Sequence, residues 1–354
     1  MSGAGEFRVG VVGAGFWARY QIAGWRELPG VKVVAIFNRT VEKARRLASE
    51  FGIEGVYGDV EQMLDDEKLD VVDVITDVDT HSKYTKLAAE RRVPVICQKP
   101  LGNSLADARG MAEFCRQRGV DLLVHENWRW QATMREVKRV LDAGTIGEVF
   151  RARMRMVSGF DVFANQPFLR SLQQFLLTDV GSHILDVARW LFGEPETVYC
   201  RTARVHKDIH GEDVASVLLA GGNTPPAGVL CEMGYAGNPI EHDKFPETLL
   251  FVEADHGTLE LASDNWLRVT TREGTLSRRI VPPRYPWANP AYDLIHSAIV
   301  PCCADLLAHL RGEKTAETTA DDNLKTVELV FASYDSADRN DVVHLGRWRD
   351  AADA

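Results

Sequence analysis

The pattern of apolar and polar positions divides this chain into two parts. In the first part, short apolar runs rich in β-branched residues alternate with stretches of helical periodicity. Strands that are apolar on both faces are typical of a parallel sheet covered by helices. We expect strands at 7–13, 31–37, 70–76, 93–97 and 120–125, and helices ending at Glu27 and covering 41–51, 81–91 and 104–118. This alternation predicts a doubly wound α/β domain.

The second part begins with a further predicted helix at 133–143 and then changes pattern. Its strands follow one another through turns, which predicts a large, open, mostly antiparallel sheet. We expect these strands at 149–157, 196–205, 215–220, 228–236, 248–254, 257–262 and 266–271, with a helix at 179–192. Two helices follow at 291–311, broken or bent near Pro301, and at 321–338.

A chain of 354 residues favours two domains. We place them at 1–127 and 128–354, and we expect the C-terminal helices to pack back on the first domain.

The composition excludes several classes of partner. The net charge is −10, and no basic patch or basic amphipathic helix is visible, which argues against nucleic acid and membrane surfaces. No charged leader precedes an apolar stretch, and no run reaches about eighteen apolar residues, so we expect a soluble, cytoplasmic protein. The six cysteines lack the spacing of a zinc site, which predicts reduced, buried thiols and no metal.

The first strand leads into the pattern Gly13-x-Gly15-x-x-Ala18. Gly13 permits a tight turn, Gly15 lets the backbone approach a pyrophosphate, and the following helix N-terminus faces the anion. The same pattern can be a plain strand-to-helix turn. Its position in the first strand–helix unit favours dinucleotide binding.

The second strand ends at Asn38-Arg39, where an NAD site usually has an acidic residue for the ribose 2′-hydroxyl. A neutral side chain followed by a cation suits a 2′-phosphate, which favours NADP modestly over NAD. Arg39 can also point into water, or lie flat on the adenine and help both cofactors.

Two further features carry candidate chemistry. Lys99, followed by Pro100, stands just past the end of a predicted parallel strand, where ligands bind in such sheets. The segment "TDVGSHILDVARW" places Asp179, His183 and Asp186 on one helical stripe. Each has an ordinary structural interpretation too: a surface lysine, a helix-capping acid, an interface histidine and an ion-pair partner of Arg189.

Taken together, these motifs resemble those of the glucose-fructose oxidoreductase, inositol dehydrogenase and rhizopine-catabolism (Gfo/Idh/MocA) oxidoreductase family. The resemblance rests on Gly13-Ala14-Gly15, on Lys99-Pro100 in "QKPL", and on "GTIGEV" and "DVGSHILDVARWLFG" in order along the chain. It implies a Rossmann domain plus an α/β domain with a large open sheet, which in this family commonly pairs subunits. A homo-oligomer, dimer or tetramer, is therefore expected.

The resemblance also implies roles for particular residues. Lys99, Asp179 and His183 are the expected catalytic residues, with His183 as general acid/base and Lys99 favouring the alkoxide. Two positions depart from the family pattern: its Glu-Lys-Pro motif falls on Gln98-Lys99-Pro100, and its Thr-Pro falls on Thr76-Asp77. The expected cofactor-binding residues are Gly13, Ala14, Gly15, Phe16, Trp17, Asn38, Arg39, Thr76, His81, Gln98, Lys99 and Asn127. The expected substrate-binding residues are Lys99, Trp128, Arg129, Asp179, His183 and Asp186.

The activity that these features indicate is NAD(P)-dependent hydride transfer to or from a secondary hydroxyl or ketone. The substrate class is a sugar, a glycoside or a cyclitol. Two alternatives remain open at this stage: redox-assisted cleavage of a glycoside through a transient keto-sugar, and a nucleotide-sensing regulator without turnover. The retained Lys99, Asp179 and His183 argue against the regulator.

Overall fold

The computed structural model of the chain describes residues 6–236 and 245–352. Two compact units are present. Of the described residues, the first consists of 6–127, 285–288 and 296–327, and the second of 128–236, 245–284, 289–295 and 328–352.

The first unit is built on a six-stranded parallel sheet in the order β3-β2-β1-β4-β5-β6. This is the strand order of the dinucleotide-binding fold, and it confirms the predicted doubly wound domain. The strands are β1 (Phe7–Val12), β2 (Val31–Phe37), β3 (Gly55–Tyr57), β4 (Val71–Val74), β5 (Val95–Gln98) and β6 (Leu122–His125).

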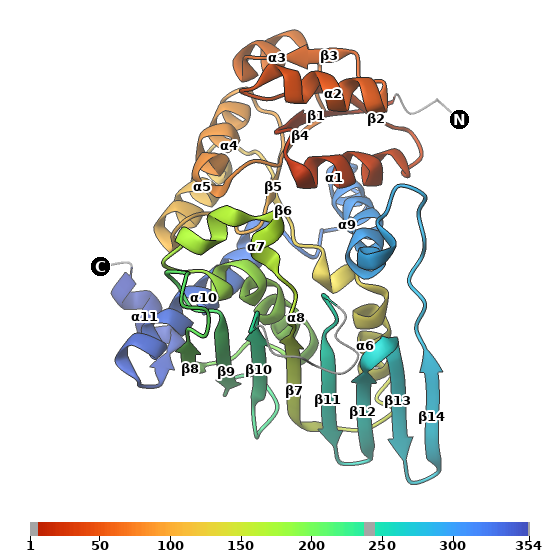
Figure 1. The fold of residues 1–354 in the computed structure, drawn as a ribbon, viewed down its shortest axis with the longest axis vertical. Coiled ribbons are helices and arrows are strands. Elements are labelled where there is room, and N and C mark those ends of the chain that lie inside the picture. The colour runs from red at the N-terminus through yellow and green to blue at the C-terminus, as the bar shows by residue number, and fades with distance from the viewer. Residues whose placement is uncertain (1–5, 237–244, 353–354) are drawn as a thin grey trace. The chain divides into compact units, whose positions relative to one another are not determined.

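Helices connect these strands, as Figure 1 shows in red to yellow. They are α1 (Phe16–Arg26), α2 (Val41–Phe51), α3 (Val60–Asp66), α4 (His81–Glu90) and α5 (Leu105–Gln117). All four residues of β4, β5 and β6 are buried, as expected for strands covered on both faces. The short pair β3 and α3 was not predicted, because neither has a long apolar run.

The late helix α9 (Asp293–Leu310) belongs to the first unit from residue 296 onward. Of the break or bend expected near Pro301, the break is absent, because the helix is continuous through that residue. The segment 290–310 is long and apolar enough to cross a membrane, but 56% of its most apolar window is buried inside the structure. Burial of this kind is typical of a core helix.

The second unit is built on a nine-stranded sheet in the order β14-β13-β12-β11-β7-β10-β9-β8-β15. Only β7 and β10 pair in parallel, so the predicted large, mostly antiparallel sheet is confirmed. The strands are β7 (Val149–Val157), β8 (Thr197–Ala203), β9 (Val214–Ala220), β10 (Val229–Gly234), β11 (Leu249–Ala254), β12 (Gly257–Ala262), β13 (Trp266–Thr271), β14 (Gly274–Arg279) and β15 (Val343–His344).

One face of this sheet is covered by helices of the same unit. Ala152, Met154 and Met156 alternate along β7 and are buried, whereas Arg151 and Arg153 between them are exposed. The helices of the unit are α6 (Ala132–Asp142), α7 (Val162–Asn165), α8 (Ser182–Phe192), α10 (Ala320–Arg339, from residue 328) and α11 (Leu345–Ala352).

The helix expected at 179–192 differs from the prediction at its start. Residues Leu177–Gly181 form a π-helical turn, and α8 begins only at Ser182. Asp179 therefore lies in the π turn, while His183 and Asp186 lie on α8. Because the π turn has a different residue spacing, the single helical stripe expected for all three residues is not formed by one regular α-helix.

Candidate active site

The glycine turn after β1 has the geometry of a dinucleotide site. Gly13 has φ +117°, and a Cβ there would lie 2.1 Å from the backbone oxygen of Ile75, so only glycine fits. A Cβ on Gly15 would meet nothing within 4 Å, which leaves open space at the start of α1. The first turn, FWAR, carries no acidic residue, so the helix N-terminus suits an anion. This turn can hold the pyrophosphate of a dinucleotide.

Asn38 holds the glycine turn in place. Its Oδ1 accepts a hydrogen bond from the backbone N–H of Ala14 at 3.1 Å, and its Nδ2 donates to the Thr40 carbonyl at 2.9 Å. Its neighbour Arg39 is exposed and forms no salt bridge with any residue that the structure describes. The guanidinium is thus available at the end of β2, where the adenosine ribose binds in this fold.

His81 connects two loops at the carboxyl ends of β4 and β5. It is buried, with Nδ1 3.1 Å from the Pro100 carbonyl and Nε2 3.0 Å from the Thr76 carbonyl. Burial lowers the pKa of this imidazole, while the two carbonyls oppose that shift. His81 therefore ties the Lys99-Pro100 turn to the loop after β4.

In the second unit, His183 lies on α8 with its ring stacked on Trp128. The ring centroids are 4.6 Å apart and the planes differ by 7°, and the two residues are 7% and 3% exposed. Stacking on an indole fixes the plane of the imidazole and leaves its nitrogens at the ring edge. A histidine held in one orientation is suited to exchanging a proton with a positioned substrate.

Asp179 is half-buried in the π turn. Its charge interacts electrostatically with the hydroxyl of Tyr235, which directly follows β10. Burial raises the pKa of Tyr235 well above its usual value, and the Asp179 carboxylate raises it further. Tyr235 is therefore a neutral, buried phenol within the electrostatic influence of the Asp179 carboxylate.

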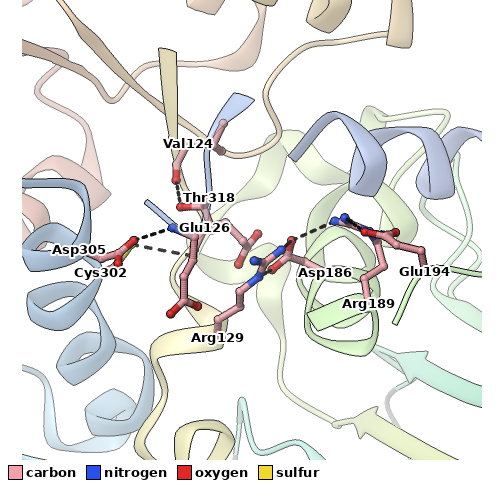
Figure 2. Close-up of polar contacts among 10 residues, drawn as sticks. Val124, Glu126, Arg129, Asp186, Arg189, Glu194, Cys302, Asp305 and Thr318 are labelled. Carbon is pink, nitrogen blue, oxygen red and sulfur yellow. Dashed lines mark hydrogen bonds and ion pairs between the residues drawn. The ribbon is translucent and has the colours of Figure 1, made fainter. Parts of the chain in front are cut away.

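Arg129 and Asp186 form a buried ion pair inside the second unit. Arg129 Nε lies 2.6 Å from Asp186 Oδ2 and Nη2 lies 2.7 Å from Oδ1, with side-chain exposures of 4% and 0%. Figure 2 shows this pair with Arg189, whose Nη1 is 3.8 Å from Asp186 and whose guanidinium also binds Glu194. Both residues were predicted to contact substrate, and that role stays a prediction. In the structure they are bonded to each other, and Arg129 follows Trp128 directly in sequence.

Sequence reasoning missed the residue that supports the π turn. The buried carboxylate of Glu212 accepts hydrogen bonds from the backbone N–H groups of Phe175 at 3.2 Å and Leu177 at 3.0 Å. It also accepts from the Tyr334 hydroxyl at 2.6 Å. These bonds anchor the start of the turn that carries Asp179. The acidic pair before β9, in "HGEDVA", is the one sequence signal that could have suggested it.

The predicted residues fall into two groups. The first unit holds those expected to bind the cofactor, from Gly13 to Asn127, together with Lys99. The second unit holds Trp128, Arg129, Asp179, His183 and Asp186. Among residues 6–236 and 245–352, no group of three His, Cys, Asp or Glu side chains could hold a metal ion. The six cysteines, all within the described residues, form no disulfide and are buried, as expected.

Comparisons with known proteins match both units. Residues 7–126 match the oxidoreductase family with an NAD-binding Rossmann fold, and residues 134–276 match the GFO/IDH/MocA C-terminal domain. A D-apiose dehydrogenase of Paraburkholderia graminis is 39% identical over 96% of this chain and 90% of its own length. The chain belongs to the Gfo/Idh/MocA family. The resemblance drawn from the sequence motifs is thereby confirmed.

Two other relatives extend across nearly the whole chain. A D-apiose dehydrogenase of Rhizobium rhizogenes is 36% identical over 96% of this chain and 98% of its own length. A solved oxidoreductase from Agrobacterium radiobacter, in complex with NAD⁺, L-tartaric acid and magnesium, is 36% identical. That structure superimposes with a TM-score of 0.94, covering 97% of this chain and 99% of the other.

Membership of the Gfo/Idh/MocA family establishes the class of activity. The chain is an oxidoreductase that transfers a hydride between a nicotinamide cofactor and the CH–OH group or ketone of a small sugar-like molecule. The predicted enzyme class is confirmed.

Proposed function

We propose that this protein is an NAD(P)-dependent dehydrogenase of D-apiose or of a closely similar pentose. The observation that carries the proposal is the similarity to two D-apiose dehydrogenases, each over 96% of this chain. The branch carbon of D-apiose carries no hydrogen. The hydride must therefore leave from a carbon that bears both a hydroxyl group and a hydrogen.

His183 is the general base in this proposal. Oxidation of an alcohol releases a proton, and an imidazole with a usual pKa near 6.5 accepts it close to neutral pH. The stack with Trp128 at 4.6 Å holds the ring in one plane while the proton moves. Asp179, in the adjacent π turn, orients a sugar hydroxyl, and the Lys99 ammonium favours the developing alkoxide.

Arg129 and Asp186 act as positioning residues in this proposal. Their mutual ion pair is buried, with side-chain exposures of 4% and 0%, which supports a positioning role. Because Arg129 follows Trp128 directly, the pair anchors the indole against α8. The indole in turn anchors His183.

The cofactor lies along the glycine turn of the first unit in this proposal. When bound, the nicotinamide accepts the hydride, and the chain itself supplies only binding and orientation. The open space at Gly15 receives the pyrophosphate. Thr76, His81, Gln98 and Asn127, at the ends of the parallel strands, line the nicotinamide end.

NADP is proposed to bind modestly better than NAD, because the exposed Arg39 can pair with a 2′-phosphate. A charge-assisted bond of about 1.5–3 kcal/mol corresponds to roughly ten- to a hundredfold preference. Titration of both oxidised cofactors against wild type and Arg39→Ala tests this assignment. NADP affinity should fall selectively in the variant; equal losses, or tighter NAD binding by the wild type, would contradict it.

A panel of pentoses, hexoses, glycosides and inositols, assayed with both cofactors at the nicotinamide absorbance, tests the substrate. We expect the highest kcat/KM with D-apiose, and an oxidised product that retains the whole carbon skeleton. Cleavage of a glycoside with no net reduction of cofactor would refute the dehydrogenase proposal.

We further propose that the enzyme works in the cytoplasm as a homo-oligomer. On the exposed face of the nine-stranded sheet, Leu218, Phe251 and Trp266 are 39%, 43% and 40% exposed. The same face carries the ion pairs Arg151–Glu253 and Arg153–Glu232. Aromatic residues such as Phe251 and Trp266 are enriched at subunit interfaces. Light scattering should give at least a dimer; a monomer at working concentration would contradict it.

A further inference from the structure

A chain of buried hydrogen bonds crosses the core of the first unit and ends at Lys99. It starts at Asp73 in the middle of β4, which is completely buried. The Asp73 carboxylate accepts from Gln21 Nε2 at 2.8 and 2.7 Å and from Trp25 Nε1 at 2.7 Å. Within the part of the chain that the structure describes, Asp73 has no cationic partner. The hydrogen bonds that stabilise its charge come from Gln21 and Trp25, both on α1.

The chain continues through a second amide. Gln98 Nε2 donates to Gln21 Oε1 and lies 3.2 Å from Nδ1 of His125. The Gln98 Oε1 accepts the backbone N–H of Lys99 at 3.3 Å. Gln21, Gln98 and His125 are all buried, at 0%, 8% and 1% exposure, so water does not compete for these bonds.

The direction of every bond follows from the charge on Asp73. The indole N–H of Trp25 can only donate, and an ionised carboxylate can only accept, so Gln21 must present its NH₂ group to Asp73. The Gln21 oxygen is then left to accept from Gln98 Nε2. The Gln98 oxygen is consequently turned toward the Lys99 N–H.

Loss of that charge reverses the arrangement. A protonated Asp73 must donate one hydrogen bond, and neither the Trp25 N–H nor the Gln21 NH₂ group can accept it. The amide oxygen of Gln21 is a stronger acceptor than a thiol sulfur, so the Gln21 amide rotates to receive this hydrogen, and the Gln98 amide rotates with it. The Lys99 N–H then faces an NH₂ group, and its hydrogen bond to Gln98 is lost.

We propose that Asp73 is a positioning residue of the reaction, whose carboxylate controls the Lys99 turn through two intervening glutamine amides. This inference rests on the proposed function insofar as Lys99 acts in catalysis. It also accounts for Gln98, which replaces the glutamate of the family motif. In this chain the buried carboxylate stands at position 73, two hydrogen-bonded amides away from the lysine.

The protonation state of Asp73, and with it the orientation of the two amides, changes near neutral pH. Burial raises the pKa of Asp73 to about 7, against the lowering effect of the bonds from Trp25 and Gln21. The thiols of Cys97 on β5 and Cys303 on α9 also face this carboxylate, and burial raises the pKa of both, so they stay neutral. The imidazole of His125 completes the set, with Nε2 3.8 Å from Cys303 Sγ.

The histidine provides a readout that does not depend on turnover. With Asp73 ionised, Gln98 donates to His125 Nδ1, so the ring hydrogen is on Nε2. After both amides rotate, the Gln98 oxygen faces Nδ1, which must then carry the hydrogen. Long-range ¹H–¹⁵N spectra of histidine-labelled protein distinguish these two forms, and a His125→Gln variant assigns the signal.

The experiment compares Asp73→Asn, Gln98→Glu and the double variant with wild type, using the NMR readout and kcat/KM for D-apiose. Asp70→Asn, the same chemical change at an exposed site outside the chain of bonds, is the matched control. At a pH well above 7, where the wild-type Asp73 is ionised, Asp73→Asn should move the hydrogen to His125 Nδ1 and lower kcat/KM roughly 10- to 100-fold, the usual effect of a misplaced catalytic group. Gln98→Glu alone should also lower turnover, because both ends of Gln21 then face carboxylates.

The double variant decides between positioning and simple packing. It moves the carboxylate from position 73 to position 98, where it accepts from both Gln21 and the Lys99 N–H, so most of the lost turnover should return. Wild-type turnover and an Nε2–H tautomer in Asp73→Asn would overturn the inference, as would a double variant no better than the singles. If the wild type oxidises no sugar, the proposed function fails, and the tautomer of His125 alone decides this inference.

Discussion

Replacement of Asp186 by asparagine tests whether this carboxylate supports the site or binds the sugar. The substitution keeps the shape of the side chain but removes the negative charge that is bonded to the buried Arg129 guanidinium. Two bonds of 2.6 and 2.7 Å are affected, and the side chains are only 4% and 0% exposed. Removing one partner of such a buried pair destabilises a protein by about 3–5 kcal/mol.

Urea unfolding followed by tryptophan fluorescence measures this loss. The matched control is the double variant Arg129→Met/Asp186→Leu, which removes both charges and should be less destabilised than Asp186→Asn alone. A stability change within about 1 kcal/mol, the size expected of an exposed pair, would refute the reasoning. A raised KM for D-apiose at unchanged stability would instead restore Asp186 as a substrate ligand.

Three other outcomes are expected. Gly13→Ala should prevent folding of the first unit, because its Cβ would lie 2.1 Å from the backbone oxygen of Ile75. Gly15→Ala should fold but bind dinucleotides weakly, because its Cβ enters open space at the start of α1. Circular dichroism measures the folding of each variant, and cofactor titration measures its dinucleotide binding. Trp128→Leu should lower kcat by roughly 10- to 100-fold and Trp128→Phe by less, because a phenyl ring can still stack on His183. His183→Ala should lower kcat by roughly 10²–10⁴. Equal effects of the two Trp128 variants would contradict the stacking role of Trp128. Because burial raises the pKa of Asp73 from 3.8 to about 7, the folded carboxyl retains its proton between these values while the unfolded one has lost it. The stability of wild type relative to Asp73→Asn should thus fall, by up to about 4 kcal/mol, as pH rises from 4 to 7. A difference that is flat across this range would contradict the raised pKa of Asp73.

Much of the fold could be predicted because the apolar pattern of most strands and helices agrees with the structure that they adopt. The predicted β2, β7, β12 and β13 match the observed strands residue for residue. The strand β14 was missed because all six of its residues, GTLSRR, are exposed at the sheet edge, so they carry no apolar alternation.

The candidate site was predictable only where a motif marks it. The glycine turn and the histidine helix have recognisable spacing, whereas the π turn has none, because it depends on bonds from the distant Glu212. The buried network was visible in part: Asp73 interrupts a strand that is otherwise apolar on both faces, and such a residue requires buried partners. Which partners it finds depends on how α1, β5 and β6 meet, and this cannot be read from spacing.

A single-turnover experiment with D-apiose tests the central claim most directly. Enzyme in excess over the sugar is mixed with NAD or NADP, and reduced nicotinamide and sugar product are both quantified for wild type and His183→Ala. The wild type should form one reduced nicotinamide per sugar oxidised, and the variant should form the same product far more slowly with cofactor affinity unchanged. Oxidation of D-apiose by the variant at the wild-type rate, or no reduced nicotinamide with the wild type, would contradict the account.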